Sequence, residues 1–211
     1  MAAVTLKEQA YIRLRQLILD GEIEAGQFLT ERHLVEMLGM SRTPIRSALE
    51  RLDAEGLANY TPNKGLIVAE LTLQRAIDLY DFRSAIECYV VKRLAQQTLD
   101  EKTLEWFESN LREQEQAKDS QDFSAFTKAD AAFHSKLMEL NGNVEIIQAI
   151  DRLQDKLYQV ALRVLRKDRS RIGVSLEDHA RIFACIRDGA SEEAFLAMER
   201  HLEYGKRILI L

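Results

Sequence analysis

Apolar residues recur every three or four positions near the start of the chain. A periodicity of this kind places side chains on one face of a helix. Over residues 5–20 the apolar positions are Leu6, Ala10, Leu14, Leu17 and Ile18. Gly21 follows, and glycine readily adopts the left-handed conformation with which many helices end. The pattern therefore predicts a first helix over residues 5–20.

Two shorter apolar stretches predict two more helices. Thr30 is placed to cap the first of them, which ends at Gly39. Ser41 is placed to cap the second. Pro44 falls in the first turn of that helix, where a missing N–H costs little, and Gly56 ends it.

A β-hairpin is predicted directly after these helices. Residues 57–60 and residues 66–68 have the composition of strands, and residues 61–65 contain the proline, asparagine and glycine of a turn. Three helices followed by a hairpin is the layout of a winged helix-turn-helix.

Helical periodicity continues through the rest of the chain, in which no proline follows Pro62. Gly142, Gly173 and Gly189 mark three breaks, and Ser175 is placed to cap the helix after Gly173. Helices of these lengths are typical of an antiparallel bundle. The six predicted helices span about residues 73–97, 100–118, 121–140, 143–168, 174–188 and 191–208.

The expected fold class is therefore mostly α, with a winged helix-turn-helix over residues 1–71 and an all-helical antiparallel bundle over residues 72–211. The composition, 46% hydrophobic and 30% charged, is typical of a globular protein. The net charge is −5, and residues 1–70 carry 8 Lys/Arg against 10 Asp/Glu. Any nucleic-acid binding must therefore depend on a local patch and a motif.

The chain carries no sign of a membrane or secretory destination. No apolar run approaches the ~20 residues of a membrane span, and the first residues lack the pattern of a signal peptide. Cys88 and Cys185 fall in predicted helices, where we expect reduced thiols. These features predict a cytoplasmic protein without a membrane partner.

The third predicted helix has the chemistry of a helix that reads DNA. Arg42 and Arg46 are four residues apart and share one face, with Ser41 and Thr43 at the start of the helix. No acidic residue occurs between Met40 and Leu49. Arginine can bind guanine edges or phosphates in the major groove. The alternative is a surface helix whose arginines are merely solvated.

Lys64 and Gly65 lie at the tip of the predicted hairpin. From there they can reach the DNA backbone or the minor groove that flanks the major-groove contact.

Three of the four histidines fall on apolar helix faces. His134, His179 and His201 each lie in an apolar stripe, and Asp130 is one helical turn before His134. Buried carboxylates and imidazoles cost free energy unless they are paired or bind a cation. One carboxylate and three neutral imidazoles suit a divalent ion such as Zn²⁺, Ni²⁺ or Mn²⁺. The alternative is three separate core histidines with ordinary hydrogen bonds.

The first third of the chain resembles the GntR family of bacterial transcription regulators. The resemblance rests on Ser41-Arg-Thr-Pro-Ile-Arg-Ser-Ala-Leu49, followed by Glu55-Gly-Leu57. It implies a winged helix-turn-helix that binds double-stranded DNA. The DNA-contacting positions that carry over are Arg32, Arg42, Thr43, Arg46 and Gly65.

The remaining two thirds resemble the effector-binding FCD domain of the FadR subfamily, and six helices are typical of its VanR-like group. The matching motifs are Asp130-x-x-Phe-His134, Asp178-His179 and Met198-x-x-His201-Leu202. In that domain an Asp-His-His-His set binds a metal at the base of a cavity. The resemblance implies a divalent ion, first of all Zn²⁺, held by Asp130, His134, His179 and His201.

Members of this subfamily commonly sense small organic acids, which implies a carboxylate effector here. Arg83 is the leading candidate for binding it, and an ion pair with Glu87 is the alternative role for this residue. Arg163 and Arg166 are further candidates that the sequence does not rank.

The expected function is a sequence-specific transcription regulator that is not an enzyme. A homodimer suits a palindromic operator, because one reading helix covers only a half-site. We expect repression that a carboxylate effector relieves. A regulator with a purely structural metal is one alternative. A metal-dependent hydrolase is another, but it would leave the DNA-binding module unexplained.

Overall fold

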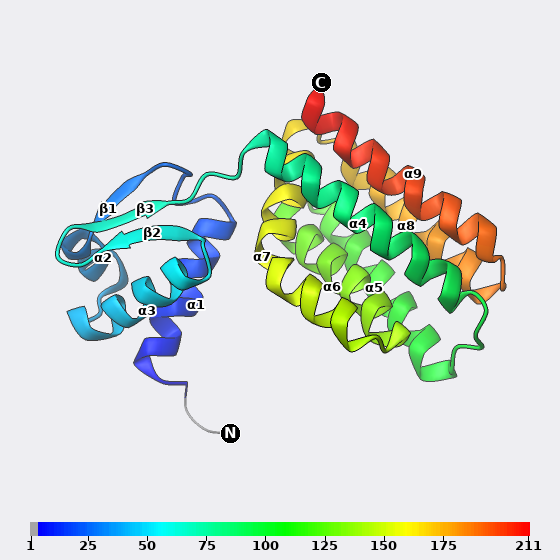
Figure 1. Cartoon of the computed structure of the whole chain (residues 1–211), viewed down its shortest axis with the longest axis horizontal. Coiled ribbons are helices and arrows are strands. Elements are labelled where there is room, and N and C mark those ends of the chain that lie inside the picture. The colour runs from blue at the N-terminus through cyan, green and yellow to red at the C-terminus, as the bar shows by residue number, and fades with distance from the viewer. Residues whose placement is uncertain (1–3) are drawn as a thin grey trace. The chain divides into compact units, whose positions relative to one another are not determined.

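The computed structural model describes residues 4–211, which divide into two compact units between Leu71 and Thr72 (Figure 1). The N-terminal unit is a winged helix-turn-helix. Its three strands are antiparallel in the order β1-β3-β2. Its elements are α1 (Leu6–Leu19), β1 (Phe28–Thr30), α2 (Glu31–Leu38), α3 (Arg42–Ala54), β2 (Ala58–Thr61) and β3 (Gly65–Val68).

Short polar side chains and a glycine set the bounds of the helix-turn-helix. The hydroxyl of Thr30 accepts a hydrogen bond from the backbone N–H of His33, so it caps α2 as predicted. Gly39 adopts the left-handed conformation at φ 64° that turns the chain toward α3. Ser41 precedes α3 but makes no capping hydrogen bond with its side chain.

The core of the N-terminal unit lies between the helices and the sheet. Its largest fully buried side chains are aliphatic, from α1, α2, α3 and β3: Leu14, Leu34, Ile45, Leu49, Leu52 and Leu66. The strand β1 was not predicted, because three residues are too few to show an alternating pattern. It pairs with β3 and thereby makes β3 the central strand.

Gly65 allows the central strand to approach β1 closely. It lies buried in β3, opposite Thr30 and Thr61, with φ at 149°. A Cβ atom at this position would lie 2.2 Å from the carbonyl oxygen of Leu29. The predicted wing glycine is thus inside the sheet, and its lack of a side chain is a packing requirement.

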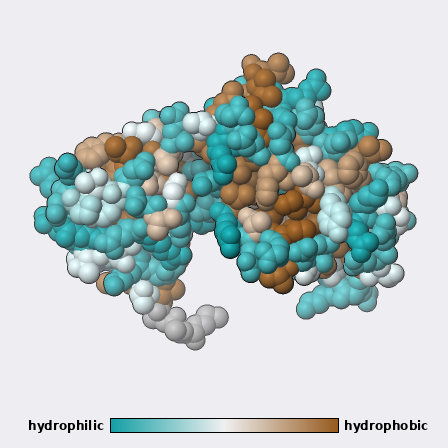
Figure 2. Space-filling model, in the orientation of Figure 1, coloured by the Kyte–Doolittle hydropathy of each residue, from teal (hydrophilic) through white to brown (hydrophobic). Residues whose placement is uncertain are grey.

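The C-terminal unit contains six helices within the described residues, as the periodicity predicted, and they form a bundle (Figure 1). Figure 2 shows apolar residues gathered on one visible part of this unit, with hydrophilic residues around them. The helices are α4 (Leu73–Leu94), α5 (Glu101–Asp119), α6 (Phe123–Asn141), α7 (Val144–Lys167), α8 (Arg171–Arg187) and α9 (Ser191–Ile210).

The start of α8 corrects the sequence prediction. Gly173 lies inside the first turn of α8 and Ser175 lies further along it, so neither ends nor caps a helix. The helix begins at Arg171, whose side chain is buried and bonds to Asp178 and to His201. These contacts hold the extra N-terminal turn in place despite its glycine. No helix in residues 4–211 is both long enough and apolar enough to cross a membrane.

We expect Gly65→Ala to destabilise the N-terminal unit by about 2–4 kcal/mol, because the new methyl group meets a backbone carbonyl in a strained conformation. Far-UV circular dichroism would then show an early unfolding transition. The single tryptophan, Trp106 in α5, reports on the C-terminal unit and should keep its wild-type midpoint. Gly26→Ala is the matched control, since φ is also positive but nothing lies within 4 Å of its Cβ position. Equal midpoints for both variants would contradict the prediction.

Candidate metal centre and DNA-reading helix

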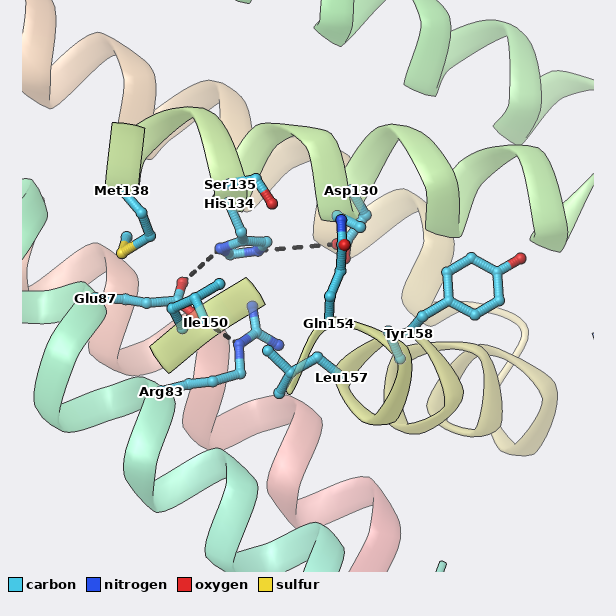
Figure 3. A pocket seen from close by; sticks show the side chains of 12 residues that line it. Arg83, Glu87, Asp130, His134, Ser135, Met138, Ile150, Gln154, Leu157 and Tyr158 are labelled. Atoms are coloured by element: carbon cyan, nitrogen blue, oxygen red, sulfur yellow. Dashed lines mark hydrogen bonds and ion pairs between the residues drawn. The ribbon is translucent and has the colours of Figure 1, made fainter. Parts of the chain in front are cut away.

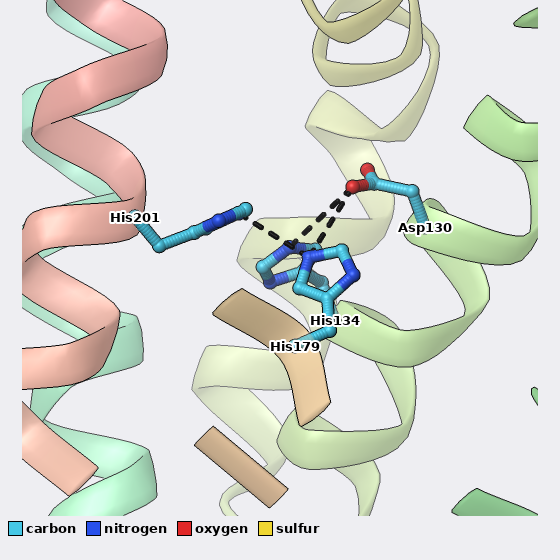
Figure 4. Close-up of side chains that lie close together, drawn as sticks. All are labelled: Asp130, His134, His179 and His201. Carbon is cyan, nitrogen blue, oxygen red and sulfur yellow. Dashed lines mark hydrogen bonds and ion pairs between the residues drawn. The ribbon is translucent and has the colours of Figure 1, made fainter. Parts of the chain in front are cut away.

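Four potential metal ligands converge in the interior of the C-terminal unit (Figure 4). Asp130 and His134 come from α6, His179 from α8 and His201 from α9, and one donor atom of each lies within 4.8 Å of the others. Oδ1 of Asp130 is 3.4 Å from Nε2 of His179 and 3.9 Å from Nε2 of His134. The Nε2 atoms of His179 and His201 are 3.3 Å apart. The predicted set is therefore brought together.

Apolar packing fixes where these side chains point. His134, His179 and His201 are buried, with whole-residue exposures of 6% or less. The ring of His179 stacks on that of Phe133, with centroids 4.5 Å apart. Because Asp130 and His134 are one helical turn apart on α6, both reach the same point.

The second nitrogen of two of these rings is held by a partner outside the cluster. Nδ1 of His134 is 2.5 Å from Oε2 of Glu87, and Nδ1 of His179 is 2.7 Å from Oε1 of Gln114. Gln114 is oriented by donating its amide to Asn110, which in turn donates to the backbone of Ala129. Each Nδ1 therefore carries the proton, and each Nε2 presents its lone pair to the cluster.

His201 has two neighbours at Nδ1. Arg171 lies 2.9 Å away and Oδ2 of Asp178 lies 3.2 Å away. Arg171 also donates to Asp178 and to the backbone carbonyl of His201. Arg171 can only donate, so while it bonds to Nδ1 the ring proton lies on Nε2. When Nδ1 instead donates to Asp178, the lone pair of Nε2 faces the other ligands, as in metal-binding histidines generally.

The electrostatics of the cluster favour the neutral forms of His179 and His201. Burial lowers the pKa of His179 well below its usual value, and the neighbouring His201 adds to this effect. Burial also lowers the pKa of His201, with Arg171 as the next cause. Nε2 of His134 is buried and has no hydrogen-bond partner in the described part of the chain. Neutral rings and an orphaned nitrogen are the donor set that a divalent metal requires.

Arg83 and Glu87 form a buried ion pair beside this cluster (Figure 3). Nε of Arg83 donates to Oε1 of Glu87 at 2.6 Å, while the other oxygen of Glu87 contacts His134. Burial opposes ionisation of Glu87, but Arg83 and His134 outweigh it and hold its pKa well below the usual range. The ion pair that was the alternative role for Arg83 is thus present, and it lies next to the candidate ligands.

Two small cavities flank Asp130. The first, of about 30 Å³, lies toward α7 and has an apolar wall that includes Met138, Ile150 and Leu157. The second, of about 20 Å³, is lined by Tyr80, Val164 and Arg171 among others. Arg83 and Asp130 line both cavities. Arg163 and Arg166 are exposed on α7 and line neither.

The start of α3 exposes three of the predicted DNA contacts. Ser41, Arg42 and Thr43 are all exposed at this end of the helix. Arg32 on α2 is also exposed and lies 3.8 Å from Glu36. Lys64 is exposed in the turn between β2 and β3, whereas Gly65 is buried as described above.

Arg46 differs from these residues because it has partners within the protein. It donates from Nε to Glu31 at 3.0 Å and from a terminal nitrogen to Asn63 at 2.5 Å. Glu31 also accepts hydrogen bonds from the hydroxyl of Tyr60 and the backbone N–H of Asn63. Glu31 therefore ties α3 to the hairpin.

Sequence reasoning missed Glu31, Gln114 and Arg171. Only Gln114 left a usable signal, because Asn110 and Gln114 are four residues apart and lie in the buried stripe of α5 with Phe107. Polar residues in an otherwise apolar stripe indicate partners inside the core.

Two protein families match this chain. "Bacterial regulatory proteins, gntR family" matches residues 6–68, and "FCD domain" matches residues 78–204. These ranges fall within the two units of the structure.

Whole proteins of the same kind are similar to the chain over most of its length. An HTH-type transcriptional regulator in unstable DNA locus of Streptomyces ambofaciens is 30% identical over 94% of this chain and 82% of its own. The HTH-type transcriptional repressor RspR of Escherichia coli strain K12 is 28% identical over 94% and 86%.

Among solved structures, McbR/YncC of E. coli has the same fold. Its TM-score is 0.80 with 21% identity, over 99% of this chain and 98% of that one. The matched families are families of regulators rather than of metal-dependent hydrolases. The chain is therefore a DNA-binding transcriptional regulator of the GntR family, and its C-terminal FCD domain places it in the FadR subfamily.

Proposed function

We propose that this regulator is a repressor whose affinity for DNA is controlled by a small carboxylate bound at a metal in the C-terminal unit. The observation that carries the proposal is the convergence of Asp130, His134, His179 and His201 on one point, with the Nε2 of His134 left without a partner. We infer that Zn²⁺ is the ion, with Ni²⁺ and Mn²⁺ as alternatives that the same ligands suit.

The surroundings of the ligands support a sensing role. Four protein donors leave a position for a further ligand on an ion that takes five or six, as Ni²⁺ and Mn²⁺ do and as Zn²⁺ does when it expands from four to five. The guanidinium of Arg83 lines both cavities beside Asp130, which is where a carboxylate on that position would lie. A metal bond combined with an arginine contact is a chemically selective site for a carboxylate.

DNA binding is assigned to the exposed start of α3, with Arg42, Thr43 and Arg46 as the leading contacts, and to Arg32 on α2. The name of the E. coli relative describes a repressor, which supports repression here. A homodimer on a palindromic operator follows from the geometry of a single reading helix. Because its target is DNA, its proposed place of action is the cytoplasm.

Control of DNA binding is proposed to be a population shift. The candidate ligands come from α6, α8 and α9, and Arg83 comes from α4. A carboxylate that binds one arrangement of these helices more tightly than another favours that arrangement. Such a ligand changes operator affinity by its differential affinity for the two states.

A purely structural metal is the competing proposal. The same four ligands tie three helices together, and a metal that only does this stabilises the fold without sensing anything. The response to carboxylates distinguishes the two proposals.

We expect chelator-treated protein to bind one Zn²⁺ per chain. At a hundred times the dissociation constant, binding adds about 2.7 kcal/mol, which raises the melting temperature by roughly 5–10 °C. His134→Ala should abolish most of this increase because it removes a ligand. His33→Ala is the matched control, since this exposed histidine lies on α2. A zinc response that survives His134→Ala would contradict the assignment.

We expect small hydroxycarboxylic acids to raise the melting temperature further, and only in zinc-loaded protein. The same acids should release the protein from its operator, measured by fluorescence anisotropy. Arg83→Met should weaken both effects, whereas Arg163→Met, at an exposed arginine of α7, should leave them unchanged. Stabilisation by zinc without any response to acids would favour the structural metal.

We expect Arg42→Ala and Arg46→Ala to lower operator affinity by different routes. An operator selected from random duplexes by the wild-type protein serves as the probe. Arg42→Ala removes an exposed contact and should cost about 1–3 kcal/mol of binding with unchanged stability. Arg46→Ala also strands the nearly buried carboxylate of Glu31 and should lower the melting temperature of the N-terminal unit.

Arg13→Ala, at an exposed position of α1, is the control for both variants. Wild-type operator binding by both Arg42→Ala and Arg46→Ala would show that α3 is not the reading helix.

A further inference from the structure

The charges around the candidate metal centre do not cancel. Arg83, Arg171 and Glu87 are buried there, and the partly buried carboxylates of Asp130 and Asp178 lie beside them. The three imidazoles are neutral as metal ligands. These side chains carry a net charge of −1, so a divalent ion brings the centre to +1. An uncompensated charge in a buried site is costly, and a bound ligand can remove it.

Glu87 is the one carboxylate in this set that is neither a candidate metal ligand nor partly solvated. Its side chain is 1% exposed, compared with 25% for that of Asp178. It holds Arg83 through one oxygen and His134 through the other. Because it contacts both the candidate effector arginine and a candidate metal ligand, its charge acts on a ligand from close range.

Glu87 neutralises Arg83 without covering it. The ion pair uses Nε of the guanidinium, and the described residues make no hydrogen bond to the two terminal nitrogens of Arg83. Those nitrogens remain available to a ligand in the flanking cavities. Arg83 can therefore still bind a carboxylate, but it contributes little net positive charge while Glu87 is ionised.

The walls of the larger cavity offer no second cation. Beyond Arg83, its lining toward α7 is apolar or neutral and includes Met138, Leu157 and Gln154. A ligand with one carboxylate would place its apolar or hydroxyl-bearing remainder against this wall. A second carboxylate placed against this wall would leave the centre at −1 and would meet no compensating charge there.

We propose that Glu87 sets the charge of the effector and restricts it to a monoanion, of the class of small hydroxy- or keto-monocarboxylates. This inference rests on the proposed function, since it assumes that a carboxylate binds beside the metal. It adds Glu87, which lines the larger cavity, as a specificity-determining residue. The cavity of about 30 Å³ holds about two water molecules, so the first ligands to test should be small.

The test compares two hydroxy acids with the same four-carbon chain, 2-hydroxybutyrate with one carboxylate and malate with two. Calorimetry on the zinc-loaded full chain gives both dissociation constants for the wild type and for Glu87→Gln. We expect the preference for 2-hydroxybutyrate over malate to fall by about tenfold or more in Glu87→Gln, because that centre carries +2. Chelation by the extra carboxylate of malate is the same in both proteins and cancels from the comparison.

A charge-matched variant separates net charge from packing. Arg83→Gln/Glu87→Gln keeps the centre at +1, so it should bind both acids more weakly but keep the wild-type preference. Arg83→Gln alone should weaken 2-hydroxybutyrate about tenfold without any gain for malate. If circular dichroism shows that Glu87→Gln is unfolded, Arg83→Gln takes its place in the test. Zinc affinity is measured by competition with a chromophoric chelator. In Glu87→Gln it should fall by no more than about 100-fold, because Glu87 bonds to the zinc ligand His134 but is not a ligand itself.

An unchanged preference in Glu87→Gln would overturn the role of Glu87 and leave the carboxylate sensor intact. A gain in malate binding by Arg83→Gln would likewise overturn it. Binding of zinc but of neither acid by the wild type would overturn both this inference and the proposed sensing function.

Discussion

The C-terminal unit depends on one constraint, which is that imidazoles buried in an apolar interior must have partners for both ring nitrogens. Unpaired polar atoms in a core cost free energy, and this cost is a large part of the small net free energy of unfolding of a helical bundle. The structure meets the constraint on one side of each ring with Glu87, Gln114 and Asp178. On the other side the nitrogens face one another and Asp130. That arrangement is satisfied only by a proton or a metal between them.

The same constraint explains why the helices of this unit pack as they do. The partners of the rings come from α4, α5 and α8, so each ring links two or more helices. Arg171 extends the network by joining the first turn of α8 to α9. The same helices are therefore held together both by the polar network and by the apolar core.

Features that depend on the spacing of residues within one helix could be predicted from the sequence. Features that depend on contacts between residues far apart in the sequence could not. Helical periodicity predicted six helices, and the stripe that contains Asp130 and His134 predicted one corner of the cluster. The convergence of three helices came from family resemblance rather than from spacing. The contacts of Glu87 with His134 and of Gln114 with His179 were not predicted, because no sequence pattern encodes which residues of distant helices meet. The start of α8 was misplaced because Gly173 normally breaks a helix, and the buried Arg171 overrides it here.

The bonds of Glu31 have a mechanical consequence for the N-terminal unit. One carboxylate holds the reading helix through Arg46 and the hairpin through Tyr60 and Asn63, so helix and wing form a single stiff body. A stiff reader cannot adjust its internal shape to a weaker or stronger DNA site. The internal shape of this unit is therefore set before it meets DNA. A signal from elsewhere in the chain can change whether or where the unit binds, but not its sequence preference.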